Sequence, residues 1–113
     1  MYETLTVRLY REGKCFGPGI AELLERVQEH RSLRAAAQSM NMAYSKAWTM
    51  VRSCEASLGR KLLLYTTGGK NGGGAELTED ADALLAGYRG YCDALQREAD
   101  DLFPQYFSTF MGQ

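Results

Sequence analysis

The chain has 113 residues, of which 45% are hydrophobic and 24% are charged, and its formal net charge is −1. These values are typical of one ordinary globular domain with a modest core. No apolar run approaches the ~20 residues that a membrane-spanning helix needs, and the first residues lack the basic stretch and apolar core of a secretory signal, so we expect a cytoplasmic protein.

The first predicted element is a small β-hairpin over residues 1–16. Residues 5–10 alternate between apolar and polar side chains, as a half-buried strand does. Residues 11–13 are typical of a turn, and residues 14–16 would form a short return strand. Gly17-Pro18-Gly19 then ends the strand and leads into a helix.

The first helix is predicted from about Gly19 to His30, and Pro18 suits its first turn. Its apolar residues recur every three or four positions and therefore share one face. This is the pattern of a core helix that packs across the two helices that follow. The residues on that face are Ile20, Leu23, Leu24 and Val27.

Residues 32–58 predict two helices joined by a tight turn. Ser32 is a good N-cap for a helix that runs to about Met40, and Asn41 tolerates the left-handed conformation that ends a helix. The second helix runs from about Ala43 to Leu58, with an apolar face and an opposite, polar face. We assign Trp48 to the apolar face, with Ala47, Val51, Cys54 and Leu58, and place Ser45, Lys46, Thr49, Arg52 and Ser53 opposite.

A hairpin is predicted after this helix, which Gly59 ends. Residues 61–66 form its first strand, residues 67–74 a glycine-rich tip, and residues 75–78 the return strand. A phosphate-binding loop is excluded because Lys70 is followed by Asn71 rather than by Ser or Thr. We prefer a wing tip that lies along a DNA backbone, and a hairpin tip without any contact is the alternative.

A long helix is predicted from its N-cap at Thr78 to about Phe103, just before Pro104. About 26 residues give a rod of about 39 Å. Its apolar sector covers roughly 200°, about twice what one core contact needs. One part of the sector would pack on the wing and the first helix, and the rest on the same helix of a second copy; burial within one chain is the alternative. The predicted pairing residues are Leu84, Gly87, Tyr88, Gly90, Tyr91 and Leu95.

The basic residues are concentrated in the middle of the chain. Residues 31–72 carry seven basic side chains and one acidic one, whereas residues 73–113 carry two basic and eight acidic ones. A cluster of this kind on a helix-turn-helix and wing is the footprint of a phosphate-binding surface. The alternative is a chance cluster on a solvated surface.

Residues with catalytic or metal-binding chemistry are scarce. Cys15, Cys54 and Cys92 are widely spaced without a C-x-x-C pair, which favours buried thiols in a reducing compartment. His30 is the only histidine, so a histidine-based zinc site is disfavoured. We find no catalytic set, and we expect neither an enzyme nor a cofactor.

Several segments resemble the DNA-binding domain of ModE-type molybdate-responsive regulators, which is itself similar to the LysR-type winged helix. The resemblance covers about residues 4–103. It rests on Gly17-Pro18-Gly19, on Ser32 to Ala37, on Met42 to Trp48, and on the glycine-rich segment from Thr67 to Thr78. The family usually has Ser where this chain has Ala43, and a basic residue where it has Tyr65. Regulators of this type also carry C-terminal oxyanion-binding domains, for which the chain has no room after Gln113, so we expect no molybdate site in it.

Together these features predict a mainly α fold with a small β component. We expect one domain over residues 1–113, with a hairpin at 1–16, a winged helix-turn-helix at 17–78 and a dimerisation helix at 78–103. The predicted function is a bacterial-type, homodimeric transcriptional regulator that binds an inverted repeat with half-sites about 34 Å apart or a multiple of this. The alternative is a winged-helix protein-interaction module that has lost DNA binding. The predicted DNA-binding residues are Arg34, Tyr44, Ser45, Lys46, Thr49, Arg52, Lys70 and Asn71, with Arg31, Arg60 and Lys61 as further phosphate contacts.

Overall fold

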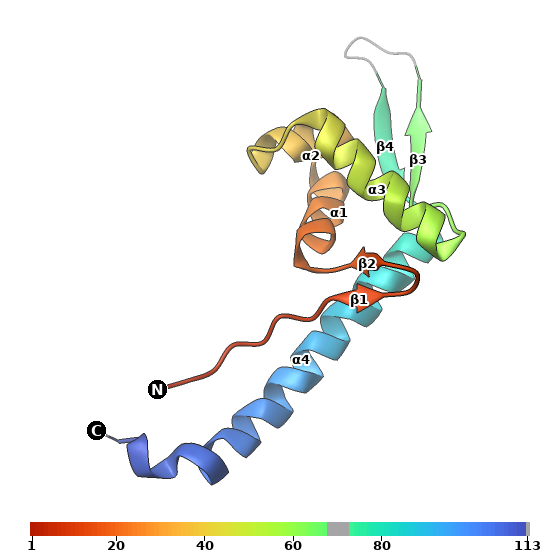
Figure 1. The fold of residues 1–113 in the computed structure, drawn as a ribbon. Helices are drawn as coiled ribbons and strands as arrows, with labels where there is room; N and C mark the ends of the chain where they lie inside the picture. The colour runs from red at the N-terminus through yellow and green to blue at the C-terminus, as the bar shows by residue number, and fades with distance from the viewer. Residues whose placement is uncertain (68–72, 113) are drawn as a thin grey trace.

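The computed structural model describes residues 1–67 and 73–112. Within them the fold is mainly helical with two small antiparallel hairpins, as the sequence predicts (Figure 1). The second hairpin, β3 and β4, is called the wing below. The elements in chain order are β1 Leu9–Tyr10, β2 Lys14–Phe16, α1 Pro18–His30, α2 Leu33–Ser39, α3 Tyr44–Leu58, β3 Leu63–Thr66, β4 Gly74–Leu77, α4 Glu79–Phe107 and a 3₁₀ turn Ser108–Phe110.

The molecule has a compact head and a projecting rod (Figure 1). Helices α1 to α3 and the wing form the head, and α4 extends away from it, so that the overall dimensions are 61 × 29 × 21 Å. The N-terminal segment runs beside the rod: the Tyr88 hydroxyl donates to the Val7 carbonyl at 2.6 Å, and the Gln96 side chain donates to Glu3 at 3.0 Å. The chain therefore begins against its own last helix.

The core lies around α1, whose predicted apolar face is buried. Leu23, Leu24 and Val27 have no exposed surface, and Phe16 from β2 and Val51 from α3 are equally buried beside them. Each such side chain contributes about 1.5–3 kcal/mol when it leaves water. Helix α1 is therefore the element on which the hairpin, α2 and α3 are assembled.

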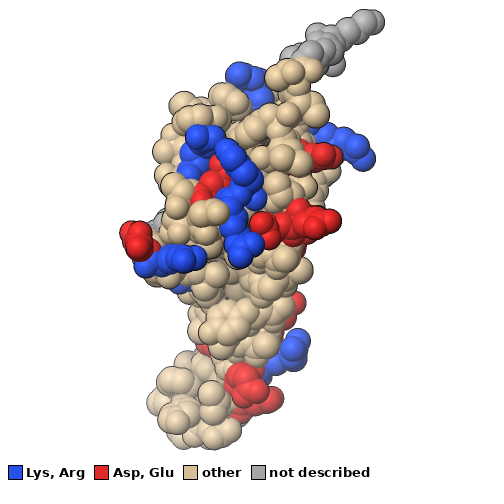
Figure 2. Space-filling model, turned by 90° about the vertical axis from the view of Figure 1, so that its right-hand side faces the viewer, with Lys and Arg blue, Asp and Glu red and all other residues tan. Residues whose placement is uncertain are grey.

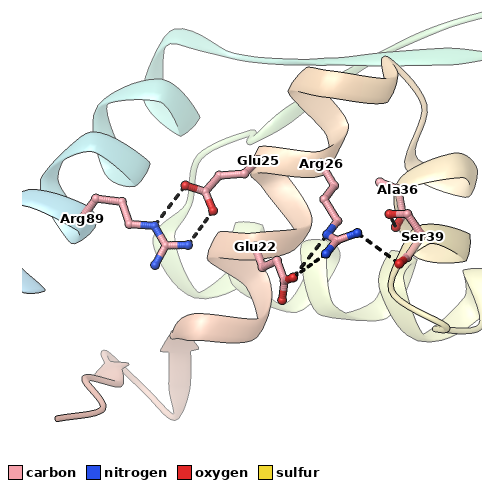
Figure 3. Close-up of polar contacts among 6 residues, drawn as sticks. All are labelled: Glu22, Glu25, Arg26, Ala36, Ser39 and Arg89. Carbon is pink, nitrogen blue, oxygen red and sulfur yellow. Dashed lines mark hydrogen bonds and ion pairs between the residues drawn. The ribbon is translucent and has the colours of Figure 1, made fainter. Parts of the chain in front are cut away.

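Polar contacts on two sides of α1 fix its neighbours (Figure 3). Arg26 binds Glu22 one turn earlier and donates to the Ser39 carbonyl at the end of α2 at 3.0 Å. On the other side, Arg89 of α4 makes two hydrogen bonds with the Glu25 carboxylate. The hydrogen bonds from Arg89 lower the pKa of Glu25. These contacts set the angle of α2 and the direction of the rod.

The helix ends follow the predicted capping chemistry. Ser32 accepts from the Ala35 amide and Thr78 from the Ala81 amide, both at 3.1 Å. Asn41 has φ 55° in the turn between α2 and α3, and Gly59 has φ 68° after α3. Ala43, at the N-cap of α3, provides no side-chain hydrogen bond. The turn between α2 and α3 is thus fixed by the backbone conformation of Asn41.

Three expectations need correction. The first strand of the hairpin spans only Leu9–Tyr10, because Leu9 pairs with Phe16, where β2 ends and the chain turns into α1. Helix α4 continues through Pro104 to Phe107; the exposed surface there lets water bind the carbonyl that a proline leaves unpaired. Tyr88 is wrongly predicted as a pairing residue: it is 4% exposed, and its ring packs edge-on against Phe16 with centroids 5.1 Å apart.

A buried carboxylate joins the end of α3 to the base of the wing. Glu55 is only 7% exposed, and one of its oxygens accepts from the Leu62 amide at 2.8 Å and from the Leu63 amide at 3.3 Å. Leu62 and Leu63 are themselves buried. The carboxylate therefore satisfies two backbone donors that water cannot reach.

Replacement of Glu55 by alanine is expected to lower the free energy of unfolding by about 2–4 kcal/mol, because two buried N–H groups lose their acceptor. Glu55→Gln keeps one carbonyl acceptor and should lose less. Chemical denaturation followed by circular dichroism measures both losses. Glu76→Ala, at an exposed site on β4, is the matched control, and an equal loss in the control and in Glu55→Ala would contradict the proposed role of this carboxylate.

Candidate nucleic-acid interface

The polar face predicted for α3 is exposed in the structure. Lys46, Thr49 and Arg52 face solvent, whereas Ala47 and Val51 are buried against α1 and the hairpin. A helix that follows a tight turn and presents long polar donors has the geometry that enters a major groove. Ser45 and Ser53 are also exposed, at the two ends of the same face.

The assignment of Trp48 to the core is wrong, because the indole is 44% exposed. At 100° per residue, Trp48 lies roughly 80° from the centre of the buried face, at its edge. The Arg52 guanidinium, one turn later, lies over the indole at 5.2 Å from the ring centre. Trp48 therefore belongs to the exposed surface of α3.

A second stacked pair lies at the N-terminal end of α3. The guanidinium of Arg34, from α2, lies 4.2 Å from the ring centre of the half-buried Tyr44. Tyr65, on β3, is partly exposed and faces the same region. The buried part of its environment raises the pKa of the Tyr65 hydroxyl, and the positive charge of Arg52 acts in the opposite direction. Aromatic and basic side chains thus occupy the surface between α3 and the wing.

The remaining basic residues differ in their exposure and in whether an acidic side chain pairs with them. Arg60 pairs with Asp80 on the first turn of α4 at 3.1 Å, so part of its charge is compensated, whereas Lys61 is exposed. Arg31 ends α1 at φ 58°, and its carbonyl accepts from the Ala75 amide at the wing. In Figure 2, basic side chains gather over the upper part of the molecule, and acidic ones interrupt them and continue along the rod. Lys70 and Asn71 lie outside the described residues.

A cavity of about 680 Å³ lies on the side of α3 nearest the N-terminal hairpin. Lys46 and Ser53 line it from α3, and Arg8 and Pro18 line it from the opposite side. Arg8 was missed by the sequence analysis, because it occupies an ordinary polar position in an alternating segment. Its place opposite Lys46 makes it a further candidate for a phosphate contact.

Two of the three predicted buried thiols meet at the floor of this cavity. Cys15 and Cys54 lie with their Sγ atoms 3.5 Å apart, and both are free. Burial, with a smaller contribution from Cys15, raises the pKa of Cys54 to about 12. Cys92, on α4, is half-buried and also free. The residues described here include no group of three or more His, Cys, Asp or Glu side chains that could hold a metal ion.

Thiol modification is expected to distinguish these cysteines. With an aromatic disulfide reagent in mildly alkaline buffer, Cys92 should react first, and Cys15 and Cys54 only after unfolding in guanidinium, because the reactive thiolate is suppressed by burial. Cys92→Ser should remove the fast phase alone. Rapid reaction of all three thiols in the folded chain would contradict the structure.

The exposed polar helix, the tight turn before it and the two-stranded wing after it define a winged helix-turn-helix domain. The profile of the family described as "Bacterial regulatory helix-turn-helix protein, lysR family" matches residues 21–82, more than half of the chain. The chain belongs to this family. None of the helices in residues 1–67 and 73–112 is both long and apolar enough to span a bilayer.

Three relatives are similar in sequence to most of this chain. The chain is 34% identical over 99 residues to the transcriptional regulator ModE of Haemophilus influenzae, which covers 88% of this chain and 37% of that protein. It is 30% identical over 84 residues to the molybdenum transport protein ModE of Azotobacter vinelandii, covering 71% and 31%. It is 34% identical over 82 residues to the molybdenum-pterin-binding protein MopB of Rhodobacter capsulatus, covering 73% and 30%. The chain thus spans about a third of the length of these relatives.

Proposed function

We propose that this chain binds double-stranded DNA as a transcriptional regulator, with α3 in the major groove and the wing on the backbone. The observation that carries the proposal is the exposed face of α3, where Lys46 and Arg52 project into solvent directly after the tight turn. Family membership supports the same function. Lys46 and Arg52 are the candidates for guanine edges, and Arg34 and Arg8 for phosphates.

The proposal includes pairing of two copies along α4. Gly87 and Gly90 are exposed, and a Cβ atom at either would meet nothing within 4 Å in the chain. Ala83 and Ala94 continue this stripe of small exposed residues, and exposed Tyr91 lies beside it. Small residues of this kind let two helices approach closely, and the aromatic side chain would cover the contact. Leu84 and Leu95 are half-buried and flank the stripe.

Selection from random duplexes, followed by a gel-shift titration at rising salt, tests DNA binding. Each phosphate that the protein neutralises should lower the slope of log affinity against log salt by about 0.9. We expect a selected inverted repeat and a steep slope. Affinity that does not change with salt would contradict the proposal.

A protein-interaction module that has lost DNA binding is the second candidate, favoured by the missing side-chain cap at Ala43. It predicts that selection returns no preferred duplex, and that a protein partner is captured from lysate after nuclease treatment. Specific duplex binding would reject it. Molybdenum, which the names of two of these relatives mention, forms no part of either candidate, because the aligned residues are only part of those proteins.

A further inference from the structure

Trp48 is the largest side chain on the exposed face of α3, and the aromatic rings of Tyr44 and Tyr65 lie on the side of this face toward the wing. Its neighbours on the exposed side of α3 are Ser45, Thr49 and Arg52. Exposing an indole to water is unfavourable, since burial of a large aromatic side chain is a major source of stability and binding energy. An apolar group on the ligand that α3 contacts would remove the exposed part of the Trp48 ring from water.

The stacked arginine gives this residue a defined orientation. Trp48 and Arg52 are one helical turn apart, so their side chains are neighbours on the helix surface, and the guanidinium lies 5.2 Å from the ring centre. Stacking restricts both side chains before any ligand is bound, which lowers the entropy that binding must otherwise remove. The two residues thus form a pre-oriented pair, in which the Trp48 indole offers an apolar surface and the Arg52 guanidinium offers two parallel N–H donors.

The edges of DNA bases in the major groove match this pair. The 5-methyl group of thymine is the apolar group there, and guanine offers the O6 and N7 acceptors to which an arginine donates in a bidentate manner. We propose that Trp48 and Arg52 act together as a specificity-determining pair, in which the indole packs on a thymine methyl group while the guanidinium binds the neighbouring guanine. This inference rests on the proposed function, and it predicts a thymine beside a guanine in each half-site.

Deoxyuridine substitution tests the pair, because it removes only the methyl group of thymine. Each thymine of the selected duplex is replaced in turn, and affinity is measured by fluorescence anisotropy at fixed salt. For the wild-type chain, one thymine per half-site, next to a guanine, should lose about fourfold in affinity, the value of one buried carbon group. Trp48→Ala should bind the thymine and uracil duplexes equally, and Trp48→Phe should keep part of the preference.

Controls separate this role from folding and from charge. Trp48→Ala should keep the far-ultraviolet circular dichroism spectrum and the salt slope of the wild type, because it removes no phosphate contact. If the wild type binds with a steep salt slope but no thymine position is sensitive, or if Trp48→Ala keeps the full sensitivity, the role of Trp48 is wrong while the proposed function stands. If the wild type shows no salt-dependent binding, both fail.

Discussion

Replacement of Lys46 and Arg52 together by alanine is expected to lower the affinity for the selected duplex by at least about 30-fold, since each base contact is worth about 1–3 kcal/mol. Both side chains project from the exposed face of α3, and neither closes an ion pair within the described residues. The folded state should therefore be unaffected. Fluorescence anisotropy with the selected duplex and with an unrelated duplex of equal length measures the loss and its specificity.

The matched control for this variant is Arg97→Ala, which removes a basic side chain from the rod about 27 Å along α4 from its first residue. It should keep the affinity of the wild type. The double variant should also show a shallower salt slope if either residue contacts phosphate instead of a base. Unchanged affinity of the double variant would remove the basis for placing α3 in the groove.

Replacement of Gly87 by lysine is expected to convert the proposed dimer to a monomer and, as a result, to abolish tight binding to the proposed inverted repeat. A Cβ atom at this exposed glycine would meet nothing within 4 Å in the chain, so we expect the lysine to fit on the surface of one copy and to clash with a second copy packed against it. Lysine is also a better helix former than glycine by up to about 1 kcal/mol, so α4 itself should be more stable. Sedimentation velocity across a concentration series reports the assembly state.

Asp93→Lys is the control, because it places the same side chain at an exposed position of α4 that lies about 120° round the helix from Gly87. We expect this variant to remain dimeric and to bind DNA at least as well as the wild type. Dimers formed equally by Gly87→Lys and by the control would show that the stripe of small residues is not the contact between copies.

Helix positions could be predicted from the sequence because their causes are local. The apolar spacing of α1 and the capping hydroxyls of Ser32 and Thr78 act over one or two turns, and the structure contains these features where they were expected. The end of α4 was misplaced, because a proline removes one helix hydrogen bond and its ring crowds the preceding turn, which is unfavourable without deciding where the helix ends. Helix α4 continues past Pro104 at exposed positions, and a local pattern does not record tertiary exposure.

Burial at the edge of a helix face was harder to predict. Trp48 and Tyr88 both occupy boundary positions, and the structure exposes the first and buries the second under Phe16. The difference depends on which distant element crosses each position. Glu55 is a similar case: as the single acid in a basic segment it has no pattern of its own, and only the path of the chain after α3 turns it into a buried acceptor.

The contact of Glu55 with the first residues of the wing has a consequence for the duplex itself. Because Glu55 of α3 accepts from two backbone amides at the base of β3, α3 and the wing are held at a set angle before they meet a ligand. In the proposed complex a rigid protein would leave the adjustment to the DNA, so the duplex would have to bend or twist to touch both elements at once. Pyrimidine–purine steps, which deform most easily, would then strengthen binding even at base pairs that no side chain reaches.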